Sequence, residues 1–277
     1  MAHPPATGTI AANRSTRRGA RTALAALAAV LALTACSSNE GDTIPEPPGS
    51  TATVTGTITV FAASSLTDAF EDIAEDFEAA NPGAEVEFNF AASSALATQI
   101  NEGAPADVFA SASPATMRTV TEAGNADGEP EVFVRNQLVI VVESGNPLGI
   151  EGLADLTDPA VKVALCAEQV PCGAAAKTAI EAAGLTITPV SFEENVRAAL
   201  AKVALGEVDA ALVYQTDAAI EPAVEAVEFP ESAEAINDYP IAVLSEAPNK
   251  PGAEAFVAYV LASDGAGVLT EYGFLEP

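Results

Sequence analysis

The stretch ITVFAASSLTDA, residues 58–69, contains an apolar strand, a turn of small residues and the beginning of a helix. From Leu66 onward, apolar residues recur at three- and four-residue spacing, which predicts a helix that stops at Asn81-Pro82-Gly83. A strand that passes through small residues straight into a helix is typical of α/β folds.

Strands and helices continue to alternate up to the end of the chain. Alternation of this kind predicts mainly parallel sheets with helices on both faces. There are too many elements for one sheet of modest size, so we expect an α/β fold with two lobes. The predicted strands beyond the first lie at 86–90, 107–110, 138–142, 161–165, 210–214 and 239–244, and predicted helices include 173–183, 196–205 and one opened by Pro114.

The composition excludes several classes of function. With 11 Lys+Arg against 39 Asp+Glu, the formal net charge is −28, and a nucleic-acid partner is excluded because phosphate binding needs a basic face. His3 is the only histidine, which disfavours enzymes and zinc sites built on imidazole. An apolar content of 49% is enough for a sizeable core.

The amino-terminal region has the three parts of a bacterial lipoprotein signal. Four arginines precede an apolar run at 22–35, which is too short to span a bilayer comfortably but suits a secretory signal. Leu33-Thr34-Ala35-Cys36 resembles a lipobox, whose cysteine is lipidated and becomes the first mature residue. We predict a signal peptide over 1–35 and a Pro- and Gly-containing flexible tether over 36–55, which anchors an extracytoplasmic protein to the cell membrane. The alternative is an ordinary signal peptide with an accidental cysteine.

Four predicted helices begin with small, polar or hydroxyl-bearing residues. The first N–H groups of a helix lack internal acceptors and carry partial positive charge. Each start taken alone is explained by N-capping. Several that face one point form an anion site beyond the carboxyl ends of the strands. The four starts are Ser64-Ser65, Ser93-Ser94, Cys172-Gly173 and Asn195-Val196.

Seven segments resemble, in family order, the molybdate-binding proteins of ABC importers. They are 58–69, 92–97, 103–108, 170–173, 195–200, 212–214 and 272–274. The resemblance implies a two-lobed solute-binding-protein fold, similar to type II periplasmic binding proteins, whose lobes are joined by two hinge strands. Its implied boundaries are 56–137 for the first part of lobe 1, 138–240 for lobe 2 and 241–277 for the segment that returns to lobe 1.

The resemblance also implies a ligand and its contacts. Ser65 and Ser93 from lobe 1 and Tyr214 from lobe 2 would donate hydroxyl hydrogen bonds to molybdate, or to tungstate. Cys172 and Val196 would donate backbone N–H groups. The metal would then have no direct protein ligand, no other cofactor would be needed, and the chain would act as a monomeric, non-enzymatic receptor. Its partners would be an ABC permease and the separate ATPase that drives it.

Two helix starts compete near Val196. Ser191-Phe192-Glu193-Glu194 matches a capping box, which would begin the helix near Phe192 and engage the Val196 N–H in the helix. Asn195 as the N-cap leaves that N–H free and places Val196, Ala199, Leu200 and Val203 on one apolar stripe. We predict that the helix begins after Asn195.

Cys166 and Cys172 are close enough in sequence to form a disulfide in an oxidising compartment. Such a bond would hold the loop that presents the Cys172 N–H. The alternatives are a reactive thiol pair or a metal site, and the latter would lack the usual histidines or second cysteine pair.

Three rival functions remain. The first is a receptor for sulfate or another tetrahedral oxyanion, and the second is a structural lipoprotein. The third is an extracytoplasmic hydrolase that uses paired carboxylates, for which Asp68, Asp107 and Asp217 are the candidates. We expect Arg197 to be a solvated side chain that points away from the ligand. A site made of donors alone selects fully deprotonated oxyanions, because a protonated phosphate needs an acceptor.

Overall fold

The computed structural model describes residues 53–277. The predicted signal peptide, Cys36 and most of the predicted tether lie outside the described residues. The strands are β1 (Thr55–Ala63), β2 (Gly83–Ala91), β3 (Val108–Ala110), β4 (Glu131–Asn136), β5 (Leu138–Glu143), β6 (Val163–Cys166), β7 (Ser191–Glu193), β8 (Ala210–Tyr214), β9 (Val224–Val227) and β10 (Asn237–Val243). The α-helices are α1 (Thr67–Ala80), α2 (Ser93–Asn101), α3 (Pro114–Glu122), α4 (Pro171–Ala182), α5 (Val196–Ala204), α6 (Gln215–Ala219), α7 (Lys250–Leu261) and α8 (Ser263–Glu271), with 3-10 helices η1 (Ser64–Leu66), η2 (Asp155–Thr157) and η3 (Pro230–Ala235).

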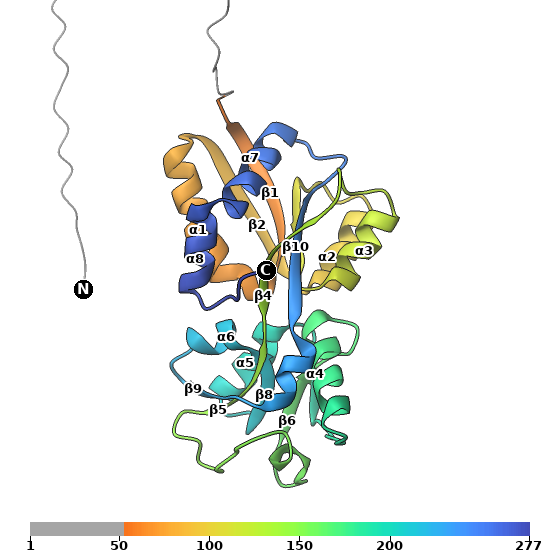
Figure 1. Cartoon of the computed structure of the whole chain (residues 1–277), viewed down its shortest axis with the longest axis vertical. Helices are drawn as coiled ribbons and strands as arrows, with labels where there is room; N and C mark the ends of the chain where they lie inside the picture. Colours follow the sequence, from red (N-terminus) through yellow and green to blue (C-terminus); the bar gives the residue numbers. More distant parts are fainter. Residues whose placement is uncertain (1–52) are drawn as a thin grey trace, which may run out of the picture. The chain divides into compact units, whose positions relative to one another are not determined.

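The strands form two five-stranded sheets, one in each lobe (Figure 1). The strand order is β2-β1-β3-β10-β4 in the first and β7-β6-β8-β5-β9 in the second. In the first sheet β10 runs antiparallel to both of its neighbours, and β5 does the same in the second. The other neighbouring pairs are parallel. Each sheet therefore has one reversed strand, and the predicted two-lobed α/β fold with mainly parallel sheets is confirmed.

The chain crosses between the lobes twice, at adjacent points. It leaves the first sheet after Asn136 and enters the second at Leu138. It returns at Asn237, where β10 begins, four residues before the expected boundary at 241. The register places Asn237 opposite Asn136, so β4 and β10 run side by side where they connect the lobes (Figure 1).

Aromatic side chains dominate the core of the first lobe. The stripe of α1 buries Phe70, Ile73 and Phe77. The ring of Phe77 meets that of Phe256 on α7 edge to face, with the centroids 5.4 Å apart. Burial of such rings is a large part of the hydrophobic driving force. This core supports β1, whose carboxyl end leads directly into η1.

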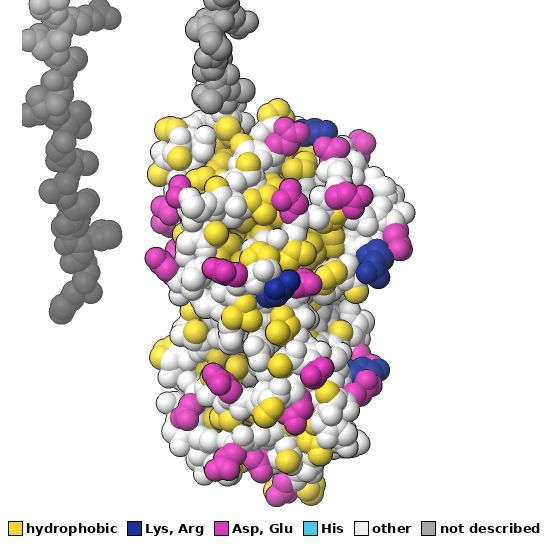
Figure 2. Space-filling view, in the orientation of Figure 1, with side chains coloured by type: hydrophobic (Ala, Val, Ile, Leu, Met, Phe, Trp, Pro, Cys, Tyr) yellow, Lys and Arg dark blue, Asp and Glu magenta, His cyan; other side chains and the backbone are white. Residues whose placement is uncertain are grey.

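The helix starts that the sequence singled out lie where the two lobes meet. In the first lobe, η1 begins directly after β1, and α2 begins two residues after β2. In the second lobe, α4 and α5 follow β6 and β7. Acidic side chains are scattered over both lobes on the face drawn in Figure 2, and basic ones are few.

Candidate functional site

A small pocket lies between the two lobes. It is formed by the ends of strands and the starts of helices, and none of its lining side chains is charged. The lining residues are Ala63, Ser64, Ser65, Ala91, Ala92, Ser93, Ala112, Val170, Pro171, Cys172, Asn195, Val196 and Tyr214.

All five predicted ligand residues line this one pocket. Ser65 lies in η1 and Ser93 is the first residue of α2. Cys172 is the second residue of α4, Val196 the first of α5, and Tyr214 the last of β8. The structure therefore brings together, from both lobes, residues that are up to 149 positions apart in the chain (214 minus 65).

The start of α5 leaves the Val196 N–H without an acceptor inside the helix. Asn195 is the N-cap, and its Oδ1 accepts from the Ala198 N–H at 3.0 Å. The competing start at the capping box is wrong, because Ser191–Glu193 forms strand β7 and pairs with β6. Pairing with a neighbouring strand outweighs the local capping signal here.

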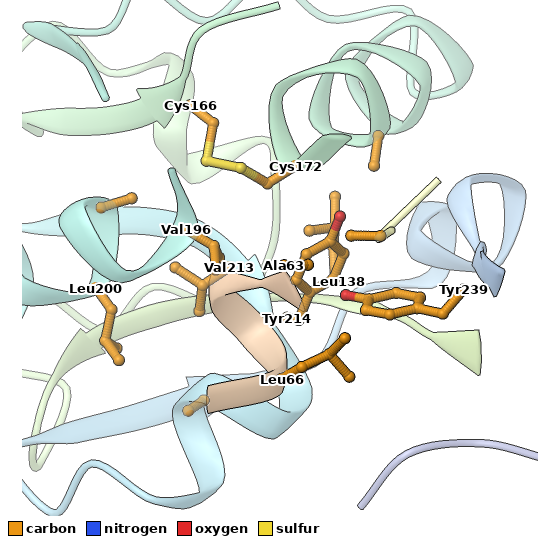
Figure 3. Close-up of a cluster of buried hydrophobic side chains, with 14 of the residues drawn as sticks. Ala63, Leu66, Leu138, Cys166, Cys172, Val196, Leu200, Val213, Tyr214 and Tyr239 are labelled. Atoms are coloured by element: carbon orange, nitrogen blue, oxygen red, sulfur yellow. A yellow bond between two sulfur atoms is a disulfide. The ribbon is translucent and has the colours of Figure 1, made fainter. Parts of the chain in front are cut away.

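A disulfide joins the end of β6 to the start of α4. Cys166 and Cys172 are bonded through their Sγ atoms, with the Cα atoms 5.8 Å apart (Figure 3). The next residue, Gly173, packs so closely that an added Cβ would lie 2.0 Å from the Ala167 carbonyl oxygen. This contact and the disulfide hold the first turn of α4 against the loop, with the Cys172 N–H in that turn.

Two pocket hydroxyls each accept a hydrogen bond from a neighbouring donor. Ser93 Oγ accepts from the Ala112 N–H at 3.0 Å, and Ser93 is only 1% exposed. Tyr214 Oη accepts from Asn237 Nδ2 at 2.5 Å. Each hydroxyl hydrogen is then available to another acceptor.

Ser65 belongs to a third polar contact at the pocket. Its Oγ lies 2.9 Å from Tyr239 Oη, and the rings of Tyr239 and Tyr214 meet edge to face with centroids 5.9 Å apart (Figure 3). Burial raises the pKa of the Tyr214 hydroxyl far above its usual range, and the negative charge of Asp217 raises it further. Tyr214 therefore stays protonated and remains a donor.

The pocket is suited to an oxyanion rather than to a metal cation. Helix N–H groups and hydroxyls donate hydrogen bonds to a ligand. The partial positive charge at each helix N-terminus also attracts an anion. Among residues 53–277, no group of three or more His, Cys, Asp or Glu side chains is placed to hold a metal ion.

A comparison with known protein families identifies the family of this chain. Residues 58–275 match a family described as bacterial extracellular solute-binding proteins. The chain belongs to this family. As a solute-binding protein, it has its candidate ligand pocket at the junction of its two lobes.

Relatives of this solute-binding protein include proteins named for molybdate or molybdenum. It is 45% identical over 94% of its length to the molybdate-binding protein ModA of Mycobacterium tuberculosis, and the alignment covers 98% of that protein. It is 30% identical over 91% of its length to a putative ABC transporter substrate-binding lipoprotein of Bacillus subtilis, covering 96% of it. Among solved structures, the substrate-binding domain of a putative molybdenum ABC transporter from Clostridium difficile has a TM-score of 0.62 at 26% identity, covering 80% of this chain and 99% of that one.

The expectation of a solvated Arg197 is wrong. Its guanidinium forms an ion pair with Asp68 of α1, in the first lobe, and its Nε lies 2.8 Å from Oδ1 of Asp217 on α6. The side chain does not line the pocket, but it pairs across the junction between the lobes and is 29% exposed. Burial raises the pKa of Asp217 to about 7, against the lowering effect of Arg197. Arg197 thus links the lobes of the solute-binding protein beside the pocket.

The three aspartates considered for hydrolysis lie outside the pocket lining. Asp107 is buried and structural, since its carboxylate accepts from the Thr59 and Asn249 N–H groups at 2.8 and 2.6 Å. Asp68 and Asp217 both pair with Arg197. These contacts explain the three carboxylates without catalysis.

Three polar residues behind the pocket were missed in the sequence. The sequence places Asn136 and Tyr239 only in the two strands expected to act as hinges, near 136–142 and 239–244, and it predicts no role for Asn237. Tyr239 and Asn237 contact the pocket residues Ser65 and Tyr214, and Asn136 contacts Thr216 and Tyr239. The available signal was their position, because polar side chains at the ends of apolar strands need buried partners.

Proposed function

We propose that this solute-binding protein captures molybdate, and tungstate as well, between its lobes and delivers it to an ABC permease driven by a separate ATPase. The names of the relatives from M. tuberculosis and C. difficile support molybdate and an ABC transporter. The proposed ligand groups are the hydroxyls of Ser65, Ser93 and Tyr214 and the N–H groups of Cys172 and Val196. No catalysis is part of this role, and we propose that the protein acts as a monomer.

The observation that carries the proposal is a pocket between lobes lined by neutral donors. A hydrogen bond to a charged group contributes about 1.5–3 kcal/mol. Several such bonds, less the costs of desolvation and closure, are sufficient for tight binding of a small dianion. The high negative charge of the protein opposes this only weakly, because salt screens charges beyond about 10 Å.

Titration calorimetry of the purified protein with molybdate, tungstate, sulfate and phosphate tests the proposal. We expect molybdate and tungstate to bind more tightly than sulfate, and phosphate to bind least. Ser93→Ala should weaken molybdate binding tenfold or more through the lost hydrogen bond. Ser94→Ala is the matched control, because Ser94 does not line the pocket. Equal affinity for molybdate and sulfate would contradict the choice of ligand.

We also propose that Cys36 is lipidated and anchors the receptor at the outer side of the cell membrane. The lipobox-like sequence and the relative named as a lipoprotein support this location. A Cys36→Ser variant should move from the membrane fraction to the soluble extracytoplasmic fraction. Retention in the membrane fraction would count against the anchor.

A further inference from the structure

The hydrogen-bonding direction of the Tyr214 hydroxyl is set by Asn237. Asn237 Nδ2 lies 2.9 Å from the Ala112 carbonyl oxygen, which can only accept. This contact orients the amide, so the same Nδ2 must donate its second hydrogen to Tyr214 Oη. Tyr214 is therefore an acceptor toward Asn237, and its own hydrogen is left for the pocket.

The hydrogen-bonding direction of the Ser65 hydroxyl depends on two residues, Asn136 and Tyr239. Asn136 Oδ1 accepts a hydrogen bond of 3.0 Å from the Gln137 N–H. Because a backbone N–H can only donate, this contact fixes the orientation of the Asn136 amide, with Nδ2 directed away from Gln137. That Nδ2 donates to Thr216 Oγ1 at 2.8 Å and to Tyr239 Oη at 3.4 Å. Because Tyr239 Oη already accepts from Asn136, this arrangement favours donation of the Tyr239 hydrogen to Ser65 Oγ, 2.9 Å away, which leaves the Ser65 hydrogen for the pocket.

Ser93 follows the same rule with a backbone partner. The Ala112 N–H donates to its Oγ, so the Ser93 hydroxyl hydrogen is also free. The three hydroxyls proposed as ligand groups, those of Ser65, Ser93 and Tyr214, thus accept from the protein on one side. Each has its hydrogen left to donate to a ligand on the other.

We propose that Asn136, Asn237 and Tyr239 are positioning residues that hold the Ser65 and Tyr214 hydroxyls as donors and thereby disfavour oxyanions that carry a proton. The inference rests on the proposed function, because it concerns the selectivity of the same site. A protonated oxyanion such as hydrogen phosphate brings an O–H into the pocket, and a hydroxyl that already accepts from the protein and donates to the ligand is a poor acceptor for it. Leaving a buried donor unpaired is costly.

The two asparagines have a further property in common. They lie opposite each other on β4 and β10, where the chain crosses between the lobes. Asn237 joins Ala112 of the first lobe to Tyr214 of the second. The directions of the Tyr214 and Ser65 hydroxyls are therefore set at the connection between the lobes, and neither Asn136, Asn237 nor Tyr239 lines the pocket.

Tyr239→Phe tests the inference, with Tyr259→Phe as the matched control. Phenylalanine keeps the packing of ring 239 against Tyr214 and Phe274 but removes the hydrogen donated to Ser65. Tyr259 packs on Phe77 and does not line the pocket. We measure molybdate and sulfate binding by calorimetry, and phosphate by its displacement of molybdate. Tyr239→Phe should lower the preference for molybdate over phosphate about tenfold and leave the molybdate-to-sulfate ratio unchanged, because a freed Ser65 can accept.

Several outcomes would overturn the inference. If Tyr239→Phe weakens all three anions by the same factor, Tyr239 is only structural. If phosphate still fails to displace molybdate, the lock does not exist. Asn237→Ala, which frees Tyr214, should produce the same loss of selectivity and serves where Tyr239→Phe does not fold. Failure of the wild-type protein to bind molybdate would instead refute the proposed function.

Discussion

Single residues contribute to this pocket in two physically different ways. Ser65, Ser93 and Tyr214 contribute side-chain hydroxyls, so a change of side chain removes the contact. Cys172 and Val196 lie in the first turns of α4 and α5, where the backbone N–H is the available donor. The side chain at these two positions is consequently free to vary, within the limits of packing.

Val196→Pro and Val196→Ala separate backbone from side chain at one position. Proline is well tolerated as the first residue of a helix, and Asn195 has the extended backbone that precedes proline (φ −157°, ψ 173°). Val196→Pro should lose tenfold or more in molybdate affinity with little change in melting temperature, because only the N–H is removed. Val196→Ala should bind almost normally. Calorimetry that finds both variants normal would refute the role of this N–H.

Among the secondary-structure elements, the N-termini of the helices supply the backbone donors of the pocket. The first turns of α2, α4 and α5 converge from two lobes on one pocket. The N-cap Asn195 sets the start of α5, and the disulfide fixes the loop before α4. Small errors in these starts would misalign N–H groups that a ligand needs within hydrogen-bonding distance.

Removing the disulfide should affect both stability and binding. In the chain-entropy model, closing a loop of this length stabilises the fold by about 2 kcal/mol. The double variant Cys166→Ser, Cys172→Ser should therefore unfold at lower denaturant concentration and bind molybdate more weakly, although the N–H at 172 is retained. Denaturant unfolding and calorimetry measure the two effects. Unchanged affinity would show that Gly173 and its contact with Ala167 suffice to hold the loop.

At the scale of the whole molecule, a ligand that contacts both lobes would favour the arrangement in which the lobes are closed on it. A ligand shifts such an equilibrium only by its different affinity for the two states. Arg197 adds a direct link, because it pairs with Asp68 across the junction. Opening of the lobes would have to break this ion pair.

Asp68→Asn should weaken molybdate binding without touching the pocket. The pair is partly exposed, so its loss corresponds to about 1 kcal/mol or less, a several-fold change in affinity at most. The loss should appear as faster release of the ligand, measured by stopped-flow kinetics. Asp72→Asn is the matched control on the same helix. Asp72 accepts a hydrogen bond from Tyr272, which follows α8 in the same lobe, so this variant leaves the contact between the lobes intact. Identical release rates for the two variants would exclude Arg197–Asp68 as a link that stabilises closure.

Much of the fold and of the candidate site could be predicted from local patterns. The strand and helix at 58–77 follow from apolar spacing, and the start of α5 follows from one good capping residue. The prediction of the five ligand residues rests on a family resemblance and not on geometry. Arg197 was missed because its partner Asp68 is 129 positions away in the chain and on another lobe.

The sequence alone determined the α/β alternation, the helix starts and the neutral character of the residues placed there, because periodicity and capping act over a few neighbouring residues. Only the tertiary structure decided that strand β10 returns beside β4, that Arg197 bridges the lobes, and that Asn136 and Asn237 orient hydroxyls across the junction. These features depend on register and burial between segments that are far apart in the chain. Short-range patterns carry no information about which distant donor meets which acceptor.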